Sequence, residues 1–363
     1  MTVTEELRRM VALNLIKDLG PVTFKKLTAH FGGLEGIFRA SPGEFRMVEG
    51  VRKNVAEAFA KRELLKEADA EIRKAQKAKV GIITLFDPRY PEALKNIFDA
   101  PNLLYVKGRL PETNTPHVAV VGSRAASFYG LKMAKQIAED LAAAGVVVVS
   151  GLALGIDSAS HEGALAANGV TLAVLGGGLN HVHRTSNKKM AEAVCEKGAL
   201  ISEYPMDMSP EPGFFPVRNR IISGLSQAVL VVEAREKSGA LIMVSQALEQ
   251  GRDVFAVPGN ADSPRSMGTN RLIKDGAKIV VSAADILEEL KINAPKKSAS
   301  NARHAELNEI ENRLLSLLSE ETLPMDELID RSQMPPSQAA STLSMLEIKG
   351  CVKQLPGKNY TKI

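Results

Sequence analysis

Three short turns of this 363-residue chain have the composition of a phosphate site. The first is Gly122-Ser123-Arg124, which follows the apolar run VAVV; the others are Ser150-Gly151 and Gly176-Gly177-Gly178. Glycine has no Cβ, so backbone N–H groups beside it can approach a ligand closely. Arginine offers phosphate a planar, bidentate partner. The dinucleotide fingerprint G-x-G-x-x-G has three glycines where the first turn has one, so we expect a different kind of phosphate here.

The segment FFPVRNRIISGLS supplies further candidates, namely Phe215, Arg218, Asn219 and Arg220. The two arginines suit phosphate, and Phe214 or Phe215 could stack against a base. Two alternatives concern Glu203 and Glu233, which end neighbouring predicted strands. They could pair with Arg218 and Arg220 inside the fold, or act as an acid/base pair on a nucleotide. Three arginines and three glycine turns together favour binding of a polyanion.

Catalysis, metal binding and cofactor binding all lack support in the sequence. No G-x-x-x-x-G-K-[ST] motif is present, which argues against an NTPase. The pair His181 and His183 has no further His, Cys or acidic cluster to complete a metal site. We therefore predict no catalytic residue, no metal and no cofactor.

The elements that position these residues alternate between strand and helix. Near-continuous apolar runs predict strands at 118–122, 146–150, 171–176, 199–204, 228–234 and 253–259, with helices such as 129–144 and 240–250 between them. This alternation predicts an α/β fold with a Rossmann-like, doubly wound, mostly parallel sheet. The glycine turns then follow the carboxyl ends of strands, where open α/β sheets bind ligands.

Segments of different composition flank this body. Residues 1–79 predict a helical, helix–hairpin–helix (SAM-like) domain, because DLGPVTFKKL and VEGVRKNVAEAF have the pattern of glycine turns between helices. In some proteins such turns bind DNA phosphates, and in others they only connect packed helices. Residues 80–290 form the Rossmann-like domain and 291–303 a basic linker. Residues 304–363 predict a winged helix. The presumed recognition helix of that domain, 336–350, has few base-reading side chains, so we expect it to contact protein.

Charge and composition limit the class of protein. The net charge is +4, with basic residues concentrated in 1–79 and in the linker, whereas 304–363 is acidic. Any nucleic-acid site in the near-neutral body must therefore be a local cluster. No apolar stretch reaches membrane length, and the two cysteines, Cys195 and Cys351, are far apart. We expect a cytoplasmic protein with no membrane association.

Several long motifs resemble one family. VAVVGSRAASFYG, VVVVSGLALGIDSASHEGAL, FFPVRNRIISGLSQAVLVVEA, SGALIMVSQALEQGRDVFAVPG and GTNRLIKDGA are similar to the DNA-processing protein A (DprA/Smf) family. The likeness extends through DPRYPEAL and PNLLYVKG and, more loosely, to both flanking domains. In this family the first turn would hold a phosphodiester of DNA.

The resemblance implies a cytoplasmic, dimeric protein that binds single-stranded DNA. Family members protect incoming strands during natural transformation and load the RecA recombinase onto them against the single-strand-binding protein. By motif match, the DNA site comprises Gly122, Ser123, Arg124, Ser150, Gly151, Phe215, Arg218, Asn219 and Arg220. Asn180, His183 and Arg184 depart from the family pattern, and Arg184 could add a phosphate contact.

Two other functions fit the same sheet. One is a nucleotide phosphoribohydrolase of the lysine-decarboxylase-like group, although EKSGALIMV lacks the carboxylate of the P-G-G-x-G-T-x-x-E stretch. The other is a scaffold that binds proteins through its end domains.

Overall fold

The computed structural model describes residues 3–60, 63–184, 187–292, 307–318, 321–349 and 351–362. The chain forms two compact units, Met1–Pro295 and Lys296–Ile363. Most of the predicted basic linker, from residue 293 on, lies outside the described residues. So do the side chains of His183 and Arg184.

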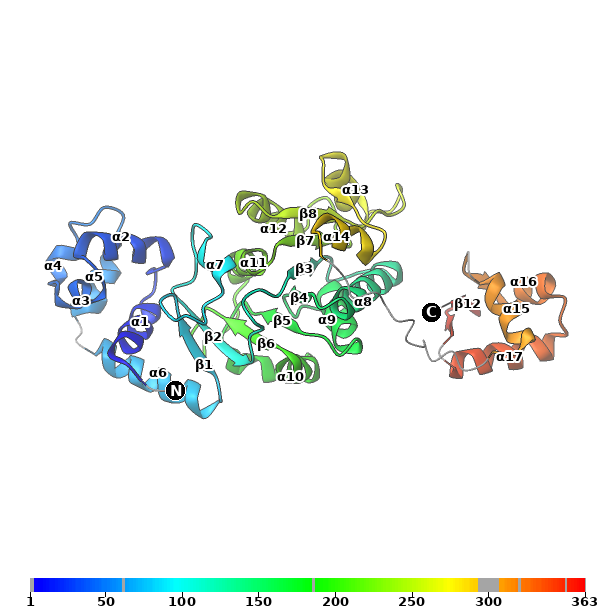
Figure 1. Cartoon of the computed structure of the whole chain (residues 1–363), viewed down its shortest axis with the longest axis horizontal. Helices are drawn as coiled ribbons and strands as arrows, with labels where there is room; N and C mark the ends of the chain where they lie inside the picture. Colours follow the sequence, from blue (N-terminus) through cyan, green and yellow to red (C-terminus); the bar gives the residue numbers. More distant parts are fainter. Residues whose placement is uncertain are drawn as a thin grey trace. The chain divides into compact units, whose positions relative to one another are not determined.

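A nine-stranded sheet forms the centre of the first unit (Figure 1). Its order is β1-β2-β6-β5-β4-β3-β7-β8-β9, and all pairs are parallel except β1–β2 and β2–β6. The strands are β1 (Gly81–Thr84), β2 (Leu103–Gly108), β3 (His117–Val121), β4 (Val147–Ser150), β5 (Thr171–Val174), β6 (Ala199–Ser202), β7 (Ala228–Val231), β8 (Asp253–Ala256) and β9 (Lys278–Ile279). The doubly wound, mostly parallel α/β sheet predicted from the sequence is confirmed. All six predicted strands are present.

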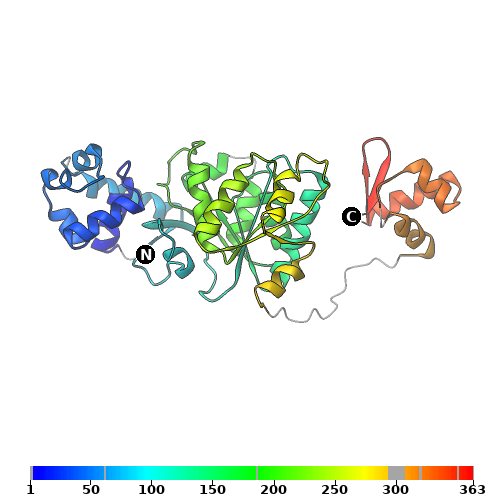
Figure 2. The same cartoon turned by 90° about the horizontal axis from the view of Figure 1, so that it is seen from above.

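Helices cover both faces of this sheet, as Figures 1 and 2 show. They are α7 (Glu92–Lys95), α8 (Phe128–Ala143), α9 (Ile156–Ala166), the 3₁₀ helix η1 (Leu179–Arg184), α10 (Lys188–Lys197), α11 (Phe214–Leu225), α12 (Gly239–Glu249), α13 (Met267–Lys274) and α14 (Ala283–Glu289). Helices α8, α9 and α14 share one hydrophobic core with the strands, and α7, α11 and α12 share another on the opposite face. Burial on two faces explains the uninterrupted apolar runs of the strands.

The chain reverses direction across β3, and this reversal locates the crevice of the fold. Successive strands β3, β4, β5 and β6 run toward one edge, after which β7 returns to the other side of β3. The helix after β3 and the helix after β7 therefore lie on opposite faces. The loops after these two strands diverge and leave an opening at their carboxyl ends, the topological switch point where such sheets bind ligands.

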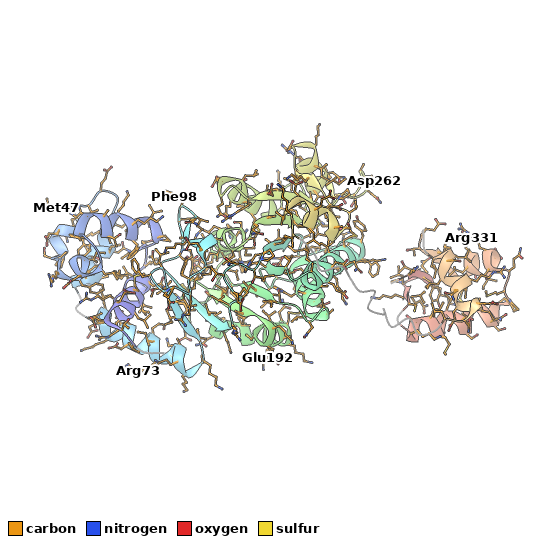
Figure 3. All side chains as sticks on the ribbon, viewed as in Figure 1. Met47, Arg73, Phe98, Glu192, Asp262 and Arg331 are labelled. Carbon is orange, nitrogen blue, oxygen red and sulfur yellow. The ribbon has the colours of Figure 1, made fainter. Side chains whose placement is uncertain are left out.

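In the part of residues 3–80 that the structure describes, six helices precede the sheet: α1 (Glu5–Leu15), α2 (Pro21–Phe31), α3 (Leu34–Arg39), α4 (Pro42–Phe45), α5 (Lys53–Ala60) and α6 (Leu64–Lys77). Pro21 begins α2, where its missing N–H costs no hydrogen bond, and Gly32 ends it with φ of 71°. These helices share a hydrophobic core with Ile82 of β1 and Tyr105 of β2. Lys25 Nζ of α2 also donates to the carbonyl oxygen of Phe98, which is labelled in Figure 3, at 2.5 Å. The domain boundary predicted at residue 79 stays a prediction, because residues 1–295 form one compact unit.

The described residues of the second unit form three helices and a small sheet of order β10-β12-β11. Its elements are α15 (Glu309–Leu317), β10 (Leu323–Pro324), α16 (Met325–Ser332), α17 (Pro336–Ile348), β11 (Val352–Leu355) and β12 (Asn359–Lys362). The arrangement fits the predicted winged helix, with β10 as an additional short strand. Among the described residues of the whole chain, none of the helices combines the length and the apolar character needed to span a bilayer.

Candidate nucleic-acid interface

The turn after β3 is fixed by close backbone packing. A Cβ on Gly122 would lie 2.8 Å from the carbonyl oxygen of Glu233 and 2.7 Å from Ile156, so only glycine fits. Ser123 N donates to that same carbonyl oxygen at 2.8 Å, and the carbonyl oxygen of Ser123 accepts from Ile156 N. The turn is thus held between the end of β7 and the start of α9. Arg124 projects from a rigid support.

The carboxylate of Glu233 stabilises the start of α8. It accepts hydrogen bonds from Ser127 N at 2.8 Å and from Ser127 Oγ, and Ser127 is the N-cap residue of α8. Glu233 is 2% exposed. The expectation that Glu233 pairs with an arginine is therefore wrong. A carboxylate at a helix N-terminus satisfies N–H groups that have no partner within the helix.

The second turn, after β4, is organised by a buried carboxylate and a buried guanidinium. Asp157 Oδ2 accepts from Gly151 N at 3.1 Å and from Ala153 N at 3.4 Å. Arg218 Nη2 donates to the carbonyl oxygen of Gly151 at 3.3 Å. Leu152, between these residues, has a positive φ of 57°, which is unusual for a branched side chain. The hydrogen bonds from both sides hold the turn in this conformation.

Burial shifts the pKa values of both charged groups. Desolvation raises the pKa of Asp157, and the nearby Arg218 opposes this effect. Desolvation lowers the pKa of Arg218, with Asp157 again opposing it and Arg124 adding to it. Each group is therefore costly to keep charged without the other. Arg218 Nε is buried and has no hydrogen-bond partner among the described residues.

Arg124 lies in a different environment. It is exposed, and no ion pair involves it among the described residues. Its guanidinium carbon lies 4.9 Å from the centre of the Phe215 ring, within the range of a cation–π contact. Phe215 is the second residue of α11, and Arg218 follows about one turn later on the same helix. An exposed cation, an aromatic ring and a buried cation thus line one opening.

Two adjoining cavities, here called the rim cavities, meet at these residues. The first, of about 310 Å³, lies between the turn after β3 and the loop after β7; the second, of about 330 Å³, lies between the turn after β4 and Gly176–Gly178. Both are lined by Arg124, Phe215 and Arg218. The first cavity lies at the switch point between β3 and β7. Cations and an aromatic ring line this cavity, as phosphate and base recognition requires.

The rim cavities bring together seven of the nine residues predicted as the DNA site. They are Gly122, Ser123, Arg124, Gly151, Phe215, Arg218 and Asn219. Ser150 is fully buried beneath the turn, where its Oγ donates to the carbonyl oxygen of Val120 at 2.7 Å. Ser150 therefore supports the site without lining it.

Arg220 does not lie with the other arginines. It points to the opposite side of α11, where it pairs with Glu203 at 2.5 Å and with Asp99 at 3.2 Å. Two residues along a helix turn the side chain by about 200°, so Arg218 and Arg220 must face opposite ways. The prediction that both arginines share one rim is corrected accordingly. The alternative that Glu203 pairs with Arg220 is the one observed.

Sequence reasoning missed two cations of the site. Arg235 and Lys237, both exposed, line the first rim cavity from the loop after β7. Their position in EAREKSG, just past a predicted strand end, could have identified them. His161 of α9 is completely buried, and its Nδ1 lies 2.7 Å from Thr171 Oγ1. Desolvation lowers the pKa of His161 to about 3.

The departures near η1 are resolved in part. Asn180 Nδ2 donates to Asp207 Oδ1 at 2.7 Å, which directs the amide away from the rim cavities. The phosphate contact predicted for Arg184 falls on a side chain outside the described residues. Across the described ranges, no group of three or more His, Cys, Asp or Glu side chains is placed to hold a metal ion.

Comparison with known proteins gives a consistent result. The family model "DNA recombination-mediator protein A" matches residues 81–291, and the model "DprA winged helix domain" matches residues 298–358. The protein Smf of Synechocystis sp. is 33% identical over 389 aligned positions, covering 97% of this chain and 98% of that protein.

Two solved structures are also similar. The X-ray structure of DNA processing protein A from Streptococcus pneumoniae has a TM-score of 0.69 at 35% identity, covering 80% of this chain and 99% of that chain. DNA processing protein A from Helicobacter pylori, reported with its single-stranded DNA binding mode, has a TM-score of 0.52 at 29% identity. It covers 59% of this chain and 96% of that one.

Proposed function

Because this chain belongs to the DNA recombination-mediator protein A (DprA/Smf) family, we propose that it binds single-stranded DNA through the rim cavities. In this proposal the bound strand is protected during DNA uptake and is passed to the RecA recombinase in the presence of the single-strand-binding protein. The protein acts as a cytoplasmic homodimer. The Helicobacter pylori relative, which is reported to bind single-stranded DNA, supports the first part of the proposal.

The observation that carries the proposal is the position of Arg124. It is exposed at the switch point, it has no ion-pair partner among the described residues, and it lies over Phe215. A free guanidinium beside an aromatic face suits one nucleotide, with the phosphate on the cation and the base on the ring. Gly122 and Gly151 have no side chains and let a strand approach the backbone closely, although Ser123 N and Gly151 N already donate to Glu233 and Asp157. Asn219, Arg235 and Lys237 extend the polar surface of the site.

Catalysis on nucleotides has less support. In the structure, Glu233 caps α8 and Glu203 pairs with Arg220, so the two carboxylates that could form an acid/base pair have other roles. Neither forms part of the rim cavities. We therefore propose a binding protein without turnover. Incubation with nucleoside monophosphates should release no free base.

A comparison of single-stranded and duplex DNA tests the central claim. We expect fluorescence anisotropy to show tighter binding of a labelled oligonucleotide than of a hairpin duplex of equal charge. The affinity should fall with salt by a log–log slope of about −0.7 for each phosphate neutralised. Equal affinity for both DNA forms, or binding that does not respond to salt, would contradict the proposal.

A second experiment addresses the finer claims. RecA filament formation on a strand coated with single-strand-binding protein should be faster with this protein present. Sedimentation should report a dimer at micromolar concentration. Unchanged filament formation would exclude the mediator role, and a sedimenting monomer would exclude the dimer. Neither result would contradict the binding of single-stranded DNA.

A further inference from the structure

A cavity of about 560 Å³ lies on the face of α11 opposite the rim cavities. It opens between the turn that joins α1 to α2, the loop after β6 and the first turns of α11. We call it the α11 back cavity. Phe214, Val217 and Arg220 line it, three residues apart along the helix, whereas Phe215 and Arg218 line the rim cavities. Helix α11 therefore presents an aromatic ring and an arginine on each of two faces.

The polar part of the back cavity has unused hydrogen-bonding capacity. Arg220 is 5% exposed and is held by Glu203 and Asp99. Nevertheless, Arg220 Nη1 and Glu203 Oε1 are buried without a hydrogen-bond partner among the described residues. Unpaired buried donors and acceptors are costly and uncommon in folded proteins. A ligand that offers an acceptor beside a donor would satisfy both atoms.

The charge of the cavity argues against a second phosphate. One guanidinium faces two carboxylates, those of Glu203 and Asp99, so this buried group carries no excess positive charge. An anion placed there would meet like charge at short range. A neutral ring with polar edges avoids this repulsion. Each nucleobase has such an edge, with hydrogen-bond donors beside acceptors.

The wall of the cavity suits a flat ring. Tyr204 and Phe214 both line it and stack on each other, with ring centres 4.4 Å apart and planes inclined by 22°. Aromatic faces of this kind bind bases with little regard to sequence. Exposed side chains such as Lys17 and Val217 lie among the lining residues, which gives the cavity an entrance from solvent.

We propose that the α11 back cavity binds a nucleobase of the same DNA strand whose phosphates the rim cavities hold. The base stacks against the Tyr204–Phe214 pair, and its polar edge meets Arg220 and Glu203. The inference rests on the proposed function. Because Phe214 and Phe215 are consecutive residues and a helix is only about 10–12 Å across, a strand reaches both cavities within a few nucleotides by passing the start of α11.

Two substitutions in the full-length protein test this inference. Phe214→Leu removes the ring but keeps an apolar side chain. Val217→Trp narrows the entrance at a helical position that is 43% exposed, where a larger side chain is compatible with folding. Each should weaken binding of a single-stranded oligonucleotide by about five- to tenfold, the lower part of the range for a lost stacking contact. The matched control is Phe86→Leu, an exposed phenylalanine that lines neither the rim nor the back cavity.

Oligonucleotides with one 2-aminopurine or one abasic position localise the effect. Fluorescence of 2-aminopurine should be quenched at one position of the strand for the wild type and for Phe86→Leu, but not for Phe214→Leu. On the strand that is abasic at that position, the wild type and Phe214→Leu should bind equally. Wild-type affinity and quenching in both Phe214→Leu and Val217→Trp would overturn the inference, and loss of binding in Arg124→Ala would show that the proposed function survives. If the wild type binds no single-stranded DNA, both the proposed function and this inference are wrong.

Discussion

At the scale of single residues, the three arginines predicted to bind phosphate occupy three different environments. Arg124 is exposed and has no ion-pair partner among the described residues, Arg218 is buried beside Asp157, and Arg220 is buried in an ion pair with Glu203. Only an accessible cation can exchange its counterions for a phosphate. The arginines therefore differ in what their removal should change.

Arg124→Ala should weaken single-strand binding by about 1–3 kcal/mol, the scale of a lost hydrogen bond to a charged group. The log–log salt slope should become shallower by about 0.7, and all sequences should be affected alike because phosphates carry no base identity. Phe215→Ala should cost a similar amount without changing the slope, since it removes stacking. The measurement is a salt titration of oligonucleotide affinity, with Arg331→Ala in the second unit as the control (Figure 3). An Arg124→Ala protein with wild-type affinity and slope would exclude the turn after β3 as a phosphate site.

His161 makes the stability of the protein depend on pH. Its pKa of about 3 in the folded state lies below the value near 6.5 of an unfolded chain. Between these values the unfolded state binds more protons, so the stabilisation is complete above about pH 6.5 and is lost as the pH falls. Lowering the pH from 7.5 to 5.5 should cost about 1.4 kcal/mol of unfolding free energy through this group.

The contribution of His161 is measured as the difference between the wild type and a His161 variant. The comparison is needed because Asp157 and Glu203 have raised pKa values, so their contribution to stability increases as the pH falls. Urea unfolding at both pH values should give a smaller loss of stability for His161→Gln than for the wild type. His30→Gln, at an exposed position, should retain the wild-type loss. The same pH dependence in all three proteins would show that His161 does not carry the effect.

At the scale of elements, the strands were predictable and the two faces of α11 were not. Long β-branched runs such as VVVVS predict buried strands because both faces of the sheet are covered. Strands β9 and β10 have two residues each, too few to produce a pattern. The candidate site was predicted well where it consists of glycine turns at strand ends. Arg220 was misplaced because its position depends on helical phase. Arg235 and Lys237 were missed because the loop after β7 has no glycine directly at the strand end to mark it as a phosphate-binding turn.

The ion pair between Arg220 and Glu203, on the second face of α11, predicts an effect on stability. Arg220→Met removes the partner of the buried Glu203 carboxylate and should lower the unfolding free energy by about 3 kcal/mol. The double variant Arg220→Met, Glu203→Gln should be destabilised by less than the sum of the single changes, because no unpaired charge remains at Glu203. Denaturant unfolding of the four proteins in this cycle provides the measurement. Additive effects would mean that the pair does not couple, and Arg124→Ala serves as the control expected to retain wild-type stability.

At the scale of the whole molecule, the first unit contains every residue proposed to touch DNA. The rim cavities and the α11 back cavity are lined by residues of Met1–Pro295. The second unit has its own small core, and residues 304–363 carry more acidic than basic side chains. An acidic surface does not attract a polyanion. The two units therefore differ in the kind of partner that they suit.

A chain ending at Ala294 should consequently keep single-strand affinity within a few-fold of the full-length value. The acidic unit contributes no attraction, and α17 contains no Arg, Lys or Asn to read bases. A second chain ending at Arg303 retains the basic linker and separates its contribution from that of the winged helix. Anisotropy titrations of the three lengths at two salt concentrations make the comparison. If single-strand affinity falls more than tenfold in the chain ending at Ala294 but not in the chain ending at Arg303, the linker binds DNA through its cations. If it falls more than tenfold in both chains, the winged helix itself is part of the DNA interface.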